Sequence, residues 1–309
     1  YRGLSLIPQP LEPVNICQKA AFREVGPMFD CSRNAVLTPE TMRFFLRKMA
    51  LMGLNLGMLY TEDTYEVPEQ PFFGYKRGRY TAQELKALDD YAFTLGIELC
   101  PCIQTLGHLR EVLRWPGFQK YKENDEVLLA DSDETYALLE QMIRAATAPY
   151  RSKKIHLGMD EAFGVGLGKH LQTYGYEDPH AIMGRHLKRV LDITEKLGLD
   201  AMMWSDMYFQ LEGNGYYESG EPTQAAKDAV DPRVTLVYWD YYHDDVAFYE
   251  DMLRKHKILS PKTAFAGGLW NWTGPAIDYP VAIANTVPAL EAARKYRVQT
   301  VLATMWGDD

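Results

Sequence analysis

Cysteine is scarce in this sequence, and its few occurrences do not form a recognisable framework. The four cysteines are Cys17, Cys31, Cys100 and Cys102. Only one residue separates Cys100 from Cys102, whereas metal and redox sites typically use a Cys-x-x-Cys spacing. We therefore interpret the cysteines as buried thiols, and we expect neither a disulfide scaffold nor a metal site built on them.

Long apolar runs and a signal peptide are also missing. No stretch reaches the roughly 18 apolar residues that a membrane helix needs, so we expect no membrane span. Without a signal peptide at Tyr1 or a disulfide pattern, the sequence favours a cytoplasmic location. The chain begins without Met and stops at Asp309 directly after an apolar strand, which we interpret as part of a longer protein.

Positive charge is in deficit. The sequence has 33 Lys and Arg against 42 Asp and Glu, a net charge of −9, and nucleic-acid binding needs basic clusters. The loops expected after the seventh and eighth strands also offer few of the Gly-rich segments and basic groups that cradle phosphates. We therefore expect no nucleic-acid partner, no dinucleotide and no other cofactor.

Hydrophobic and aromatic residues, by contrast, are abundant, at 47% and 12% of the 309 residues. They fall into eight apolar strands that alternate with helices. The strands are expected at 26–31, 54–60, 97–102, 154–158, 200–205, 234–240, 262–269 and 300–306. This order predicts an α/β fold, a (β/α)8 TIM barrel over residues 25–309 that lacks its last helix in this chain.

Residues 1–24 read as an irregular lead-in of the kind that ends a preceding domain. The alternative architecture is an open doubly wound sheet. That fold usually shows a Gly-rich fingerprint after its first strand, and this sequence has none there.

The fourth strand ends in two adjacent carboxylates, in the run Lys154-Ile-His-Leu-Gly-Met-Asp-Glu161. Alternation along a strand would turn Ile155, Leu157 and Met159 towards the helices, and His156, Gly158 and Asp160 the other way. Glu161 would lie where the strand opens into a loop. On this stretch alone, a strand followed by an acidic helix cap explains the pattern equally well.

In a parallel barrel the carboxyl ends of the strands share one rim, where active sites lie. Here these ends carry acidic, basic and aromatic side chains: Asp30, Arg33, Glu62, Asp63, Gln104, His108, His156, Asp160, Glu161, Trp204, Asp206, Trp239, Asp240, Tyr241, Tyr242, Trp270, Trp272, Trp306, Asp308 and Asp309. Carboxylates and Arg bind hydroxyls, and aromatic faces cover the C–H faces of a sugar ring. Taken singly, Trp204 or Trp270 would more often be barrel packing than a ligand contact, and Arg33 could be a structural partner of Asp30.

These strand-end motifs resemble those of the family 20 glycoside hydrolases, the β-N-acetylhexosaminidases, from about Gly26 to Asp309. The most specific is His156-x-Gly-x-Asp-Glu161, which is similar to the family's His-x-Gly-x-Asp-Glu signature. The other matches are Asp30-x-x-Arg33, Asn55 with Asp63, Gly107-His108, Trp204-x-Asp206 and Trp306-x-Asp308, the last with Asp in place of the usual Glu.

The resemblance implies an exo-acting, retaining enzyme that removes a terminal N-acetylhexosamine from oligosaccharides or glycoconjugates. The substrate's own acetamide would attack C1 and give an oxazolinium intermediate. Glu161 would be the general acid and base, and Asp160 would orient the acetamide N–H. Tyr241 would donate to the acetamide oxygen, with Tyr242 as the alternative.

The remaining implied roles concern the acid's protonation and the binding of the sugar. His108 and Asp63 would form a relay that tunes Glu161. The implied substrate-binding residues are Arg33, His156, Trp204, Asp206, Trp270, Trp272, Trp306 and Asp308. No metal is implied, and the oligomeric state and the choice between GlcNAc and GalNAc stay open.

Two other functions are compatible with the same residues. One is a metal-dependent barrel isomerase or hydrolase, with Asp63, Asp160, Glu161 and Asp206 as ligands of a divalent cation. The other is an inactive glycan-binding module. The presence of both Asp160 and Glu161 argues against the second.

Overall fold

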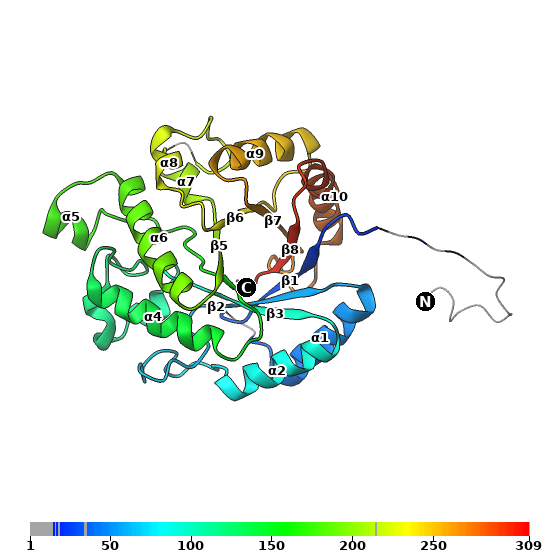
Figure 1. The fold of residues 1–309 in the computed structure, drawn as a ribbon, viewed down its shortest axis with the longest axis horizontal. Coiled ribbons are helices and arrows are strands. Elements are labelled where there is room, and N and C mark those ends of the chain that lie inside the picture. Colours follow the sequence, from blue (N-terminus) through cyan, green and yellow to red (C-terminus); the bar gives the residue numbers. More distant parts are fainter. Residues whose placement is uncertain (1–14, 16, 18, 34–35, 214, 309) are drawn as a thin grey trace.

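Eight parallel strands close into a barrel in this computed structural model, which describes residues 15, 17, 19–33, 36–213 and 215–308. The strands are β1 (Glu24–Asp30), β2 (Leu56–Thr61), β3 (Glu98–Ile103), β4 (Lys154–His156), β5 (Asp200–Trp204), β6 (Thr235–Trp239), β7 (Thr263–Gly268) and β8 (Thr300–Met305). Each pairs with the next, and β8 pairs with β1 (Figure 1). The predicted (β/α)8 barrel is confirmed.

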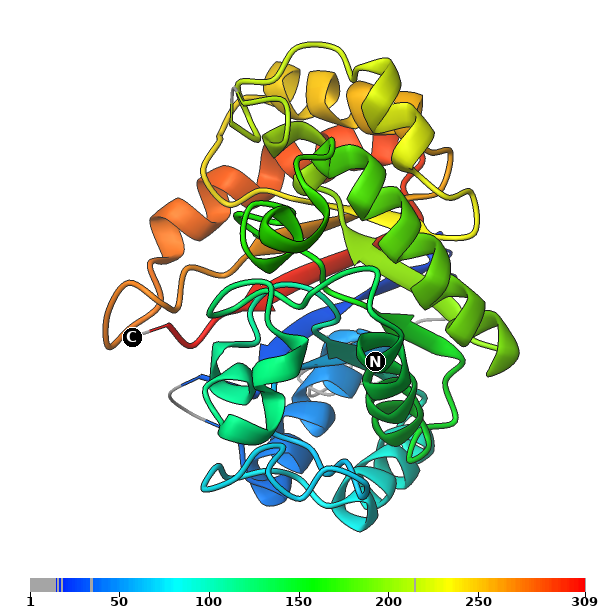
Figure 2. The same ribbon diagram turned by 90° about the vertical axis from the view of Figure 1, so that its left-hand side faces the viewer.

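Helices surround the barrel and connect successive strands (Figures 1 and 2). The connecting helices are α1 (Pro39–Met52), α2 (Ala82–Thr94), α4 (Asp133–Thr147), α6 (Pro179–Lys196), α8 (Gln224–Ala229), α9 (Val246–Leu259) and α10 (Tyr279–Lys295). Shorter helices lie within the loops: α3 (Arg110–Leu113), the 3₁₀ helix η2 (Pro116–Tyr121), α5 (Lys169–Tyr174) and α7 (Met207–Gln210). Among these described helices, none is both long and apolar enough to cross a membrane.

Local sequence signals set the helix ends. Thr81 and Glu84 form a capping box at the start of α2, each accepting a hydrogen bond from the other's backbone N–H. Thr38 caps α1, and Gly53 ends it in the left-handed conformation that glycine adopts without a Cβ penalty. These signals fix where each helix begins, and so how long the loop before it is.

Two apolar cores result from the alternation of side chains along the strands. The inner core fills the barrel with Met28, Met58, Tyr60, Cys102 and Trp204, among others. The outer core lies between strands and helices and contains Ile155, Leu157 and Met159, as the alternation predicted. The barrel interior is therefore packed, and chemistry is confined to its rim.

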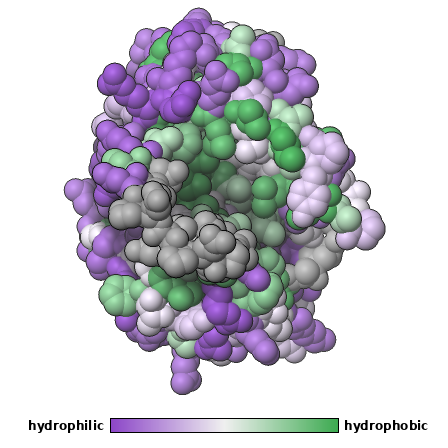
Figure 3. Space-filling model, turned by 90° about the vertical axis from the view of Figure 1, so that its right-hand side faces the viewer, coloured by the Kyte–Doolittle hydropathy of each residue, from purple (hydrophilic) through white to green (hydrophobic). Residues whose placement is uncertain are grey.

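The described chain has no helix after β8. On the outward side of β8, Met305 is only partly buried, and Ile283 and Val287 of α10 are exposed. Viewed from the side of α1 and α10, the surface shows apolar side chains around a hollow (Figure 3). The predicted lead-in falls mostly outside the described residues and stays a prediction; β1 begins at Glu24.

Candidate active site

The chain turns sharply after β4 and delivers two carboxylates to the rim. β4 ends at His156, two residues earlier than predicted, and Gly158, Met159 and Glu161 have positive φ angles of 70°, 71° and 46°. Glycine suits position 158, because its φ is in the left-handed region and a Cβ there would lie 2.7 Å from the Ile103 backbone carbonyl oxygen. The turn therefore replaces the predicted strand end and places Asp160 and Glu161 side by side.

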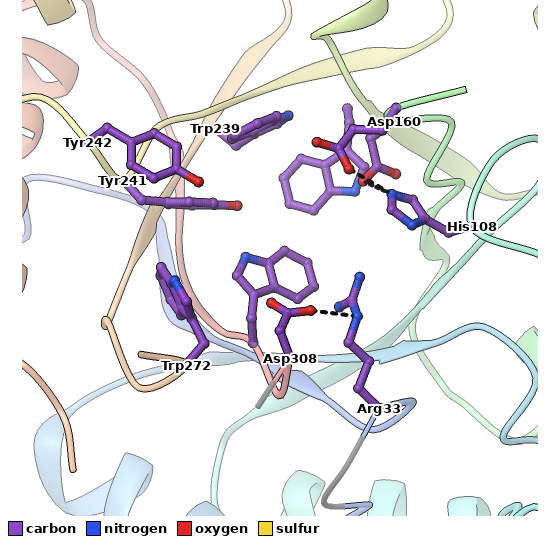
Figure 4. A pocket seen from close by; sticks show the side chains of 11 residues that line it. Arg33, His108, Asp160, Trp239, Tyr241, Tyr242, Trp272 and Asp308 are labelled. Carbon is purple, nitrogen blue, oxygen red and sulfur yellow. Dashed lines mark ion pairs between the residues drawn. The ribbon is translucent and has the colours of Figure 1, made fainter. Parts of the chain in front are cut away.

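Asp160 and Glu161 share one imidazole. His108 Nε2 lies 3.2 Å from Asp160 Oδ2 and 3.3 Å from Glu161 Oε2, and Gln104 Nε2 donates to Asp160 Oδ1 at 2.8 Å (Figure 4). The side chain of Asp160 is 13% exposed and that of Glu161 39%. Asp160 is thus held below the surface, and Glu161 stands at the mouth.

The charges of this trio stabilise one another. Burial alone would lower the pKa of His108, but the neighbouring Asp160 carboxylate raises it to about 11. Burial would likewise raise the pKa of Asp160, and the His108 charge with the hydrogen bond from Gln104 lowers it below its usual value. At neutral pH, Asp160 is therefore a carboxylate beside an imidazolium.

Aromatic rings form the opposite wall of the same pocket (Figure 4). Its lining is made of Arg33, His108, Asp160, Glu161, Trp204, Trp239, Tyr241, Tyr242, Trp272, Trp306 and Asp308. Trp239 stacks on Tyr241 with ring centroids 5.3 Å apart, and Trp272 meets the Tyr241 ring edge-on at 5.4 Å. Tyr241 is buried, whereas Tyr242 is 55% exposed at the mouth.

The ends of β1 and β8 close the pocket on a third side. The Arg33 guanidinium packs over the rings of Tyr60 and Trp306, with its Cζ atom 5.3 Å from each centroid. Its Nη1 atom is 2.9 Å from Asp30 Oδ2, which also accepts a hydrogen bond from the Gly307 N–H at 3.0 Å. Asp30 therefore fixes both Arg33 and the segment that carries Trp306 and Asp308.

Four predicted site residues do not line the pocket, and these positions correct the prediction. Trp270 stacks on Trp272 from behind and donates its indole N–H to the Tyr241 carbonyl. His156 is fully buried within the barrel, where its ring packs on Trp204 at 4.3 Å. Both support the wall without facing the pocket.

The other two are the acidic residues Asp63 and Asp206. Asp63 is buried and pairs with Arg77 at 3.2 Å, so in the described residues its recorded ionic partner is Arg77 and not His108. Asp206 is fully buried behind the turn and accepts the Glu161 backbone N–H. Trp239, which the sequence placed at a strand end but to which the resemblance gave no role, also lines the pocket. Asp309 lies outside the described residues.

The cation-ligand alternative required Asp63, Asp160, Glu161 and Asp206 to converge. Asp63 is engaged by Arg77, and Asp206 lies beneath the Glu161 backbone. Within the described ranges, no group of three or more His, Cys, Asp or Glu side chains is placed to hold a metal ion. The four acids thus do not form the ligand set that this alternative needs.

A carboxylate pair and a guanidinium in an aromatic pocket on the C-terminal face of a (β/α)8 barrel define a glycoside hydrolase. Residues 22–263 match the family described as glycosyl hydrolase family 20, catalytic domain. The chain therefore belongs to this family, as its motifs predicted.

Individual relatives agree with this assignment. Human hexosaminidase D is 24% identical over 240 residues, which cover 74% of this chain and 48% of the human protein. Bovine hexosaminidase D is 22% identical over 259 residues, which cover 78% of this chain and 68% of the bovine protein. The chain thus spans about half the length of the human relative.

Solved structures share the fold. The exo-β-N-acetylglucosaminidase of Vibrio harveyi superposes with a TM-score of 0.69 at 18% identity, over 92% of this chain and 50% of that one. A β-N-acetylhexosaminidase from Bacteroides fragilis superposes with a TM-score of 0.68 at 17% identity, over 93% of this chain and 61% of that one.

Proposed function

We propose that this protein is an exo-acting, retaining β-N-acetylhexosaminidase that removes terminal β-linked GlcNAc or GalNAc through an oxazolinium intermediate. The observation that carries the proposal is the adjacent pair Asp160 and Glu161, joined to one imidazole inside an aromatic pocket. Neighbouring residues on one turn cannot flank a glycosidic bond as acid and nucleophile. A nucleophile supplied by the substrate removes that requirement.

The environments of the two acids divide their roles. Asp160 stays ionised, so it can accept the acetamide N–H and stabilise the positive charge that develops on the forming ring. Glu161 stands at the mouth, where the leaving oxygen would pass, and is suited to donate a proton and then to activate water. Burial raises the pKa of Tyr241 well above its usual value, so its hydroxyl keeps its proton and can donate to the acetamide oxygen.

Exo action is supported by the walls of the pocket. Arg33 and Asp308 close one side, 2.8 Å apart, and Tyr241 with Trp272 closes another. The closed end offers a cation, a carboxylate and ring faces, which suit the hydroxyls and C–H faces of one terminal sugar. A chain continuing beyond that sugar would meet these walls.

The test is turnover of chromogenic β-N-acetylglucosaminide, β-N-acetylgalactosaminide and β-glucoside in the presence of EDTA. We expect both N-acetylated sugars or one of them to be cleaved, inhibition by a thiazoline mimic of the oxazolinium ion, and a loss of about 10²–10⁴-fold in kcat for Glu161→Gln. Glu126→Gln, which changes an acid paired with Arg110 outside the pocket lining, is the control. Equal cleavage of the β-glucoside, or near-normal turnover by Glu161→Gln, would refute the proposal.

A further inference from the structure

Asp206 is a buried acid that holds the catalytic turn from behind. It follows β5 and begins α7, and its side chain is fully buried. Its Oδ2 atom accepts two hydrogen bonds, from the Glu161 backbone N–H at 3.0 Å and from Gln210 Nε2 at 2.9 Å. Its Oδ1 atom is buried, and the neighbouring Trp239 side chain partly offsets the effect of burial on the pKa of Asp206.

The contact with Glu161 bears on the geometry of the proposed acid. Glu161 has a φ of 46°, a conformation that residues with a Cβ adopt rarely and keep only when their surroundings impose it. The hydrogen bond to Asp206 is made by the backbone of that same residue. Asp206 therefore helps to fix the direction in which the Glu161 side chain leaves the chain.

The charges around Asp206 oppose a negative charge on it. The titratable groups that face it are Asp160 and Glu161 from the turn after β4, and Tyr216 from the segment after α7. The two cations of the pocket are engaged elsewhere: Arg33 pairs with Asp30 and Asp308, and His108 with Asp160 and Glu161. Burial and the Asp160 carboxylate raise the pKa of Asp206 to about 8.

We propose that Asp206 is a positioning residue that acts in its protonated form, a neutral acid whose carbonyl oxygen holds the Glu161 backbone in the active turn. This inference rests on the proposed function only in assigning the acid role to Glu161. Ionisation of Asp206 would put a buried charge beside Asp160, and the turn would open to hydrate it. Turnover is then lost as the proton leaves Asp206.

The first test compares Asp206→Asn with Asp206→Ala. The amide keeps a neutral acceptor of the same shape, so at pH 6 we expect its kcat/KM to stay within about 3-fold of the wild type, and KM to be unchanged. Alanine removes the acceptor and should lower kcat about 10²-fold with little change in KM, the effect of a misplaced catalytic group. An amide variant as defective as the alanine variant at pH 6 would show that Asp206 works as a carboxylate and would overturn the proposal.

The second test is independent of turnover. An acid whose folded-state pKa is raised binds its proton more tightly when folded, so its contribution to stability falls as pH rises from about 4 to about 8. The stability of Asp206→Asn relative to the wild type should therefore rise across that window and level off above it. Asp192→Asn, an exposed acid on α6 paired with Arg233, is the control.

A difference between Asp206→Asn and the wild type that does not change with pH would also overturn the proposal. Because unfolding requires no substrate, an inactive protein that passes this test would refute the proposed function and leave the protonated Asp206 in place.

Discussion

Arg33 Nε lies 2.8 Å from Asp308 Oδ1, across the seam where the last strand of the barrel meets the first. Arg33 follows β1 and Asp308 follows β8, so the pair can form only when the barrel is closed. Both side chains line the pocket. Closure of the barrel therefore also closes this side of the pocket.

Removing the charge of Asp308 should weaken substrate binding more than stability. In Asp308→Asn we expect KM to rise about 10-fold, which corresponds to about 1.4 kcal/mol, with kcat within about 3-fold. Asp308 is 48% exposed, and Arg33 keeps its pairs with Asp30 and Glu62, so the melting temperature should change little. Steady-state kinetics measures the change in KM, and thermal unfolding measures the change in melting temperature. An unchanged KM would show that Asp308 does not contribute to sugar binding.

Gly268 provides the space in which the aromatic wall packs. A Cβ at this position would lie 2.4 Å from Trp272 Cη2 and 2.8 Å from Tyr241 Cδ1. Gly268→Ala should therefore shift both rings and lower kcat/KM about 10²-fold, since the proposed acetamide donor moves with them. Gly274→Ala is the matched control, because nothing lies within 4 Å of a Cβ there. Equal activity of the two variants would contradict this role of the wall.

His108 should set the acidic limit of activity. The His108 charge is one cause of the lowered pKa of Asp160, which burial would otherwise raise. In His108→Asn the pKa of Asp160 should rise, and because Asp160 is proposed to act as a carboxylate, the acidic limb of the kcat/KM profile should move to higher pH. Profiles of kcat/KM from pH 3.5 to 8 test this. An acidic limb at the same pH in the variant and the wild type would show that His108 does not control the ionisation of Asp160.

Three buried histidines should make the fold sensitive to acid. Burial lowers the pKa of His156 to about 3, and of His186 and His256 to about 4. Their contribution to stability is present above the unfolded pKa of about 6.5 and is lost as pH falls towards 4, because only the unfolded chain takes up the protons. Each adds about 1.4 kcal/mol per pH unit to the slope of the unfolding free energy in that window.

Urea unfolding between pH 4.5 and 7 measures this slope. The His186→Gln variant retains a side chain able to face Tyr136 and the Thr105 carbonyl. It should reduce the slope of the unfolding free energy with pH by the contribution of one histidine. If the slope of the variant equals that of the wild type, His186 is already protonated in the folded protein.

Much of the fold could be predicted because its signals are local. The capping box at Thr81, the terminating Gly53 and the outward set Ile155, Leu157 and Met159 are short patterns whose meaning does not depend on distant residues. Some candidate site residues lie where the alternation of a strand would carry them. Trp306 and Asp308 line the pocket because they extend the inward side of β8 beyond its end.

Predictions failed where the chain leaves the strand by a route that the local sequence does not specify. Asp206 would continue the inward side of β5, but its backbone is already helical at φ −55° and ψ −39°, so its side chain lies beneath the Glu161 backbone. Asp63 was expected near His108, and the long loop after β2 instead brings Arg77 onto it.

The sequence by itself determined the barrel, the strand that carries the two carboxylates and the family to which the chain belongs. These follow from alternation, helix caps and adjacent residues, which act over a few positions. Only the tertiary structure decided which acids line the pocket and which support the turn from behind, and that His108 contacts both Asp160 and Glu161. The reason is that charge and burial at the rim depend on side chains from different strands, which meet only when the barrel closes.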